Sequence, residues 1–106
     1  MNGLTSKSSI AGATLTAVEL VGDVSLKYYA ETDNPALLGV GVASYLGLTY
    51  VLQDALRTEK LAIVNGYWDA YSNLLTTGVA VGVLGEQVNT QQIAGLLLIG
   101  AGLWLL

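Results

Sequence analysis

Two carboxylates spaced one helical turn apart are the residues of this sequence best suited to chemistry. Glu19 and Asp23 lie in the stretch VELVGDVSLK, residues 18–27, which is otherwise mostly Val, Leu and Gly. Residues four apart share a helix face, so we expect both carboxylates to point the same way. Lys27 follows one turn later, where Asp23 can reach it and be neutralised. Glu19 is therefore the candidate functional acid and Asp23 its support; the alternative is that Glu19 is structural, paired with Lys27 or a neighbouring helix.

The composition indicates that this helix lies in a membrane. Of 106 residues, 53% are hydrophobic and only 11% are charged, whereas roughly a quarter are charged in an ordinary soluble domain. Three runs without charge, 35–53, 70–85 and 88–106, reach or approach the ~20 residues that span a bilayer. We predict a multi-pass integral membrane protein of a cell or virion membrane. The competing interpretation of the first segment is a cleavable signal peptide, which its two acids disfavour.

Four helices are expected to position the two acids, at about residues 10–27, 36–57, 61–84 and 91–106. They would form one all-α membrane bundle, with residues 1–106 as a single domain. Pro35 is expected to begin the second helix, because a missing N–H is harmless at the first position. The short link 58–60 predicts that the second and third helices are antiparallel neighbours.

Several classes of function are excluded by what the chain lacks. Cysteine and histidine are both absent, which removes disulfides and the usual ligands of zinc. The net charge of −4 offers no basic surface for nucleic acid. No nucleophile, phosphate-binding loop or metal constellation stands out. We therefore expect neither enzymatic activity nor a cofactor.

The order of these features resembles the small multidrug resistance family of proton-coupled exporters. Glu19-Leu20-Val21-Gly22, followed by Leu26-Lys27, is similar to the family's first-helix motif. Trp68 stands where the family has its tryptophan, and Gly85-Glu86 resembles the turn before the last helix. The glycine-rich segment 93–102 is similar to the family's dimerisation helix. The resemblance runs without a gap from residue 17 to residue 103.

This resemblance implies a homodimer in which two copies of Glu19 line one cavity and bind either protons or a small organic cation. Tyr45 and Trp68 would line the same pocket. Asp69 beside the tryptophan resembles one subunit type of the paired polyamine exporters, so polyamines are candidate substrates. Asn65 replaces a tyrosine of the family and would support the site. The alternative for the aromatic residues is packing or anchoring at the membrane interface.

Small residues mark where helices are expected to approach closely. Gly95 and Gly102 lie on one seam of the last helix with Leu98 between them, and we expect this seam to join two copies of the chain. Small residues permit such close contact between membrane helices. A second seam of this kind is expected on the second helix, formed by Gly39, Ala43 and Gly47.

The chain also departs from the family. Ala70-Tyr71-Ser72 replaces the G-x-G kink that follows the tryptophan. This loss favours a second hypothesis, a structural subunit of a larger membrane assembly, such as a virion inner-membrane or capsid-associated protein, that keeps the fold without transport. A passive channel is less favoured, because no helix carries a continuous polar stripe.

Overall fold

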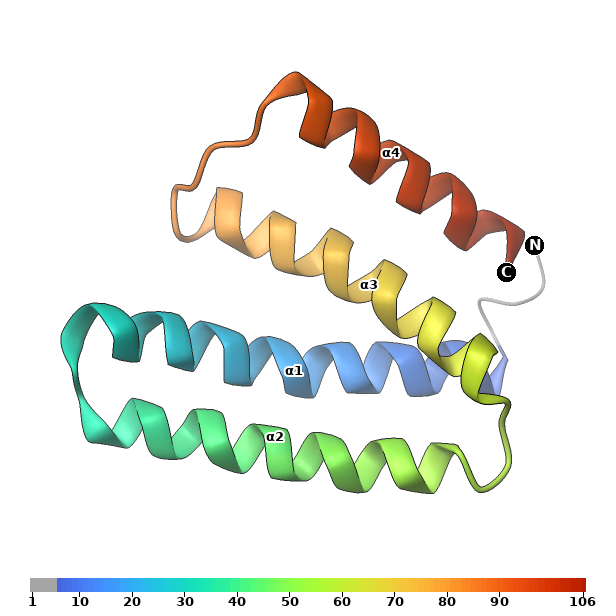
Figure 1. Cartoon of the computed structure of the whole chain (residues 1–106), viewed down its shortest axis with the longest axis horizontal. Helices are drawn as coiled ribbons and strands as arrows, with labels where there is room; N and C mark the ends of the chain where they lie inside the picture. Colours follow the sequence, from blue (N-terminus) through green and yellow to red (C-terminus); the bar gives the residue numbers. More distant parts are fainter. Residues whose placement is uncertain (1–5) are drawn as a thin grey trace.

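Four α-helices make up the computed structural model, which describes residues 6–106 (Figure 1). They are α1 (Lys7–Thr32), α2 (Pro35–Ala55), α3 (Leu61–Gly82) and α4 (Thr90–Leu105). No strand occurs among the described residues, so the prediction of an all-α chain is confirmed. Residues 1–5 of the expected single domain lie outside the part described.

The first helix is longer at both ends than the hydrophobic pattern predicted. It begins at Lys7 because the Ser6 side chain caps it, accepting a hydrogen bond from the Ser9 N–H at 3.1 Å. It continues to Thr32 and ends where Asp33 adopts a left-handed backbone, with φ of 58°. The Asp33 N–H then reaches the Tyr29 carbonyl at 2.7 Å, a common way to end a helix. Residues 28–32, which follow the predicted end of the first helix, are therefore helical.

The remaining helices begin at residues suited to that place. Pro35 occupies the first turn of α2, as predicted, and the Asn34 side chain accepts a hydrogen bond from the Ala36 N–H at 3.1 Å. At α4, Asn89 and Gln92 form a reciprocal capping box, with both hydrogen bonds at 2.8 Å. Gly85 takes a φ of 71° in the preceding loop, a conformation that suits glycine.

The helices lie side by side in the order α2, α1, α3, α4 (Figure 1). The molecule measures 42 × 37 × 16 Å, and a helix with its side chains is about 10–12 Å across. The fold is therefore a thin layer, thicker than one helix where the first half of α3 crosses α1 (Figure 1). The prediction that the second and third helices are neighbours is wrong in this respect: they run in opposite directions, but α1 is the helix that packs against both.

Glycines on α1 explain why it takes the central place. A Cβ added at Gly12 would lie 2.7 Å from the Tyr67 Cβ on α3, and one added at Gly22 would lie 3.0 Å from the Tyr45 ring on α2. Each glycine thus admits a neighbouring helix at close range, one on each side.

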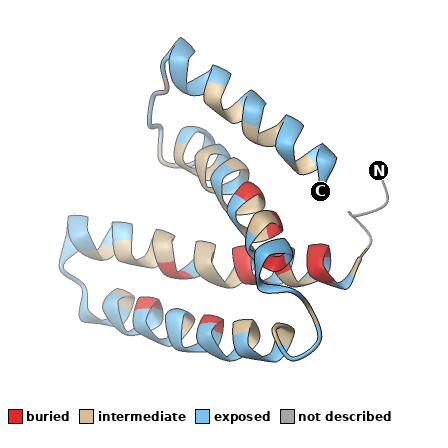
Figure 2. Cartoon of the chain, turned by 45° about the vertical axis from the view of Figure 1, so that its right-hand side comes forward, coloured by how far each residue is buried: buried red, intermediate tan, exposed pale blue. Residues whose placement is uncertain are grey.

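The core is small for a chain so rich in apolar residues (Figure 2). Leu15, Leu48 and Val64 form its centre, where α1, α2 and α3 meet. Within α4, all of which is described, no residue is buried. Large apolar side chains remain exposed instead, including Leu46 at 69% and Leu105 at 84%. Apolar surface on this scale marks contact with a membrane or another protein.

Two of the helices, α1 and α2, are long and apolar enough to cross a membrane. In their most apolar windows only 33% and 11% of the residues are buried. The fourth helix is also apolar but has 16 residues.

Candidate functional site

The two acids of α1 reach different neighbouring helices. The Ser72 hydroxyl on α3 donates a hydrogen bond to Glu19 Oε1 at 2.5 Å. The Tyr45 hydroxyl on α2 donates to Asp23 Oδ1. The two carboxylates, one helical turn apart on α1, therefore bind hydroxyls of different helices, although Asp23 also lines the space between α1 and α3. The reason lies in the packing: α1 has a helix on each side, and each carboxylate turns toward the hydroxyl that the nearer helix offers.

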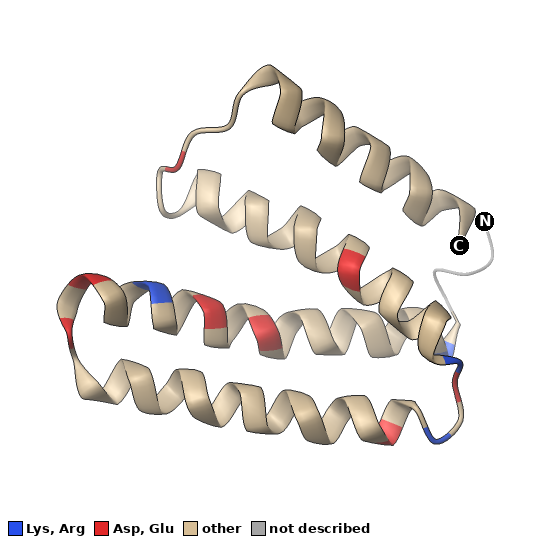
Figure 3. Cartoon of the chain, viewed as in Figure 1, with Lys and Arg blue, Asp and Glu red and all other residues tan. Residues whose placement is uncertain are grey.

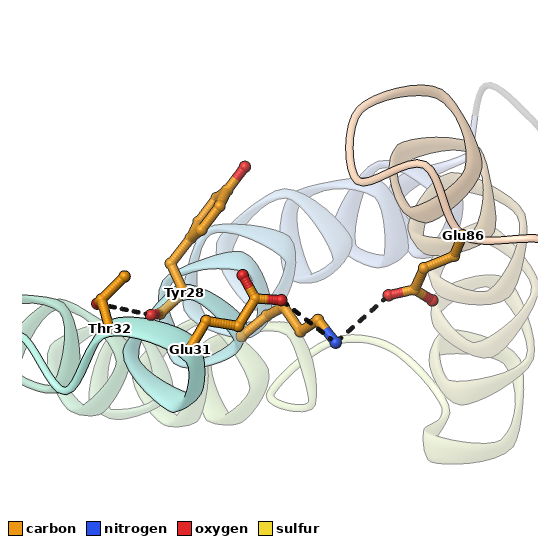
Figure 4. A network of polar contacts seen from close by, with 5 residues as sticks. Tyr28, Glu31, Thr32 and Glu86 are labelled. Atoms are coloured by element: carbon orange, nitrogen blue, oxygen red, sulfur yellow. Dashed lines mark hydrogen bonds and ion pairs between the residues drawn. The ribbon is translucent and has the colours of Figure 1, made fainter.

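The predicted pair between Asp23 and Lys27 does not form. Lys27 Nζ lies 3.7 Å from Glu31 Oε1 and 3.7 Å from Glu86 Oε2. Glu31 lies near the end of α1 and Glu86 lies in the α3–α4 loop, and Figure 4 shows their carboxylates directed toward a shared point. Since Lys27 is held there, no Lys or Arg in residues 6–106 forms an ion pair with Glu19 or Asp23.

The hydroxyl of Tyr45 is expected to stabilise the α1–α2 contact. Tyr45→Phe removes the donor to Asp23 and should lower the free energy of unfolding by about 0.6–1.7 kcal/mol, the range for hydrogen bonds between membrane helices. Thermal unfolding in one detergent measures this. Tyr50→Phe is the matched control, because Tyr50 lies on the same helix at 69% exposure. Equal effects of the two substitutions would contradict a role for the Asp23 contact.

Trp68 is a partly buried residue at the edge of the core. Its ring packs against the cluster centred on Leu15 and Val64, and its carbonyl accepts a hydrogen bond from Thr16 Oγ1 at 3.5 Å. The indole Nε1 is buried and has no hydrogen-bond partner among the described residues. Ser72 follows Trp68 by four residues and so shares its helix face. The structure therefore places the predicted aromatic residue one turn from the serine that binds Glu19, in a packing position.

Asp69 and Asn65 lie apart from Glu19. The Asn65 amide donates to Asp69 Oδ2 at 3.4 Å, and the Asn73 amide donates to the Asp69 carbonyl at 2.8 Å. Asp69 lines a hollow of about 310 Å³ between α3 and α4, together with Ile99 and Leu103. Consecutive helical residues are about 100° apart, so Trp68 faces α1 while Asp69 faces α4. The predicted pairing of Asp69 with Glu19 in one cavity does not occur within the chain, and the argument for polyamines loses its second acid.

The predicted seams are placed as follows. Gly95 and Gly102 line hollows between α3 and α4, and Leu98 beside them is 73% exposed.

The seam expected on α2 faces elsewhere. A Cβ at Gly39 would meet no described atom within 4 Å. The close contacts between α1 and α2 are made by Gly41 of α2 against a side chain of α1, and by Gly22 of α1 against side chains of α2. The seam expected at Gly39, Ala43 and Gly47 is therefore not the one that joins α1 and α2.

The sequence reasoning missed two residues that build the site. Ser72 was noted only as part of a lost kink, although its spacing of four from Trp68 places it on the same face. Gly12 was not noted, although Ser8, Gly12 and Thr16 recur every four residues, a spacing that signals close helix packing. All three are buried on α1.

Charged side chains are sparse within the helices (Figure 3). The acidic residues that lie away from the helix ends are Glu19 and Asp23 on α1 and Asp69 on α3. Residues 6–106 contain no group of three or more His, Cys, Asp or Glu that could hold a metal ion. No protein-family model, curated protein or solved structure matches this chain. The resemblance described above therefore rests on the residues alone.

Proposed function

We propose that this chain is a membrane-embedded exchanger of protons for small organic cations, similar to the small multidrug resistance exporters, with Glu19 as the shared binding residue. One observation carries the proposal. Glu19 is a half-buried carboxylate between α1 and α3 whose hydrogen-bond partner is the uncharged Ser72 hydroxyl. No described Lys or Arg neutralises it. An acid without a counter-ion inside a membrane is costly and is usually functional.

The exposure of the helices supports membrane insertion. The core helix of a soluble protein is mostly buried, but α1 and α2 bury 33% and 11% of their apolar windows. A cleaved signal peptide does not suit α1, because it supplies Leu15 to the core and packs against both α2 and α3. Lipid is the surrounding that best covers the exposed apolar faces.

The mechanism follows from competition for one charge. The Glu19 carboxylate is neutralised either by a proton or by an organic cation. The Ser72 hydroxyl serves both states, because it donates to the ionised carboxylate and can turn to accept from the protonated one. In a dimer the two Glu19 side chains would titrate as a coupled pair. Exclusive binding is what would link the opposite movements of proton and cation.

The proposed oligomer is a homodimer joined along one flank of α4. Gly95→Leu and Gly102→Leu should each convert dimers to monomers in mild detergent, because small residues admit close van der Waals contact between membrane helices. Mass measurement and crosslinking report the change. Gly100→Leu is the control, because Gly100 lies about 160° around α4 from Gly102 and a Cβ there likewise meets no described atom within 4 Å. Dimers that persist in both glycine variants would move the interface elsewhere.

A structural subunit of a larger membrane assembly is the second candidate. The observation that favours it is the continuity of α3, which runs unbroken from Leu61 to Gly82. The helical hydrogen bonding is thus continuous through residues 70–72, where the resemblance implies a glycine kink. On this reading the apolar faces would meet other chains.

The two candidates differ in one measurement. Purified protein in weakly buffered detergent solution is mixed with a panel of organic cations, and the pH is followed. An exchanger releases protons as a cation displaces them from Glu19. A folded oligomer that releases no protons across the whole panel would decide for the structural subunit.

A further inference from the structure

A cavity of about 180 Å³ lies between α1 and the second half of α3. Glu19 does not line it, so it is separate from the site of the proposed function. Its walls are mostly apolar and include four polar residues. The apolar residues are Leu20, Val24, Val79, Ala80 and Leu84; the polar ones are Asp23, Lys27, Thr76 and Glu86.

One polar atom of this lining has no partner. The Thr76 hydroxyl oxygen is buried and makes no hydrogen bond within residues 6–106. Buried polar groups in proteins nearly always have a hydrogen-bond partner, and leaving one without costs about 1–3 kcal/mol. Because Thr76 lines the cavity, a bound molecule that carries a hydrogen-bonding group would give this buried hydroxyl a partner after a small rotation of the side chain.

The charges around the cavity favour a cation. Asp23 and Glu86 line it, and Lys27 connects Glu86 to Glu31 at 3.7 Å on each side. The two carboxylates and one ammonium that line the cavity sum to a formal charge of −1. Asp23 uses one oxygen to accept from Tyr45, which leaves its other oxygen as an acceptor. A bound ammonium group would offset this charge and compete with Lys27 for Glu86.

The volume limits the size of the ligand. An engineered apolar cavity of about 150 Å³ binds benzene, so a cavity of about 180 Å³ has room for one ring or a short alkyl chain with a small polar group. The apolar walls suit the hydrocarbon part, and Thr76 with the two acids suits the ammonium.

We propose that this cavity is a second cation site, which binds a small aryl- or alkylammonium ion. The hydrocarbon part packs against Leu20, Val24 and Val79. The ammonium group lies between Asp23 and Glu86, within reach of the Thr76 hydroxyl. Occupancy loosens the ion pair between Lys27 and Glu86, which holds the α3–α4 loop to α1 (Figure 4).

The test measures binding of benzylammonium to the purified full chain in detergent by isothermal titration. Benzyl alcohol is the neutral probe of nearly the same shape. We expect benzylammonium to bind at least tenfold more tightly. Glu86→Gln should weaken it about tenfold, while Glu31→Gln should change it less than threefold, because Glu31 contacts Lys27 at the same distance but does not line the cavity.

Filling the cavity should also abolish binding. Val79→Trp places a large ring in the space, and Val81→Trp is the control, because Val81 is 42% exposed and outside the lining. Thr76→Val keeps the shape of the side chain and should weaken benzylammonium binding severalfold. This variant tests the cavity if the Val79→Trp protein does not fold. Equal affinity for benzyl alcohol, or equal effects of Glu86→Gln and Glu31→Gln, would overturn the proposal.

Binding in this cavity can be tested separately from proton exchange at Glu19. Glu19→Gln should leave benzylammonium binding in this cavity within threefold of the parent, whether or not cations release protons at Glu19. Loss of binding in Glu19→Gln would show that the ammonium binds at Glu19 and would overturn the second site.

Discussion

Glu19→Gln is expected to reduce cation-driven proton release at least tenfold, to the background of the assay. Gln keeps the volume of the side chain and its hydrogen-bonding capacity but cannot ionise, so Ser72 retains a partner and the fold should persist. The measurement is the pH change of a weakly buffered protein solution on addition of an organic cation. Thermal unfolding of the same sample shows whether the variant is folded.

Asp54→Asn is the matched control for Glu19→Gln. Asp54 is an exposed acid near the end of α2 and far along the chain from the contact between Glu19 and Ser72. The Asp54→Asn variant should release protons on addition of a cation to the same extent as the parent protein. The structural-subunit candidate predicts a different result: no release in the parent, and a Glu19→Gln variant that is as stable as the parent or more so, since removing a buried charge can stabilise.

Gly12→Ala is expected to have the largest effect on the fold. The added Cβ would lie 2.7 Å from the Tyr67 Cβ and 2.9 Å from the Trp68 backbone nitrogen. Backbone atoms cannot rotate away, so α1 and α3 must separate, which should destabilise the protein by about 1–3 kcal/mol. Thermal unfolding in detergent measures the loss. Because Ser72 lies one turn beyond Trp68, its hydrogen bond to Glu19 should weaken as well.

Gly78→Ala separates the steric effect of Gly12→Ala from helix propensity. A Cβ at Gly78 would meet no described atom within 4 Å, and alanine is favoured over glycine in a helix by about 1 kcal/mol. Gly78→Ala should therefore leave stability unchanged or raise it. If both alanine variants unfold at the same temperature, the close contact at Gly12 does not hold α1 to α3.

Local chemistry in the sequence was sufficient to predict the helices. Stretches rich in apolar residues and the polar links between them located all four, and Pro35 marked the start of α2 as expected. The ends of α1 were less predictable. Capping by Ser6 and the left-handed backbone of Asp33 extended it at both ends, and the apolar pattern carries no information on either.

The grouping of the site residues depended on packing that a single helix does not specify. Spacing placed Glu19 and Asp23 on one face of α1. Only the packing of the neighbouring helices determined that Glu19 binds Ser72 of α3 and that Asp23 binds Tyr45 of α2. Adjacent positions in the sequence put Trp68 beside Asp69, yet the turn of α3 directs one to α1 and the other to α4. A side chain's partner is set by which helix lies nearest, and close approach at Gly12 and Gly22 is what made α1 the neighbour of both α2 and α3.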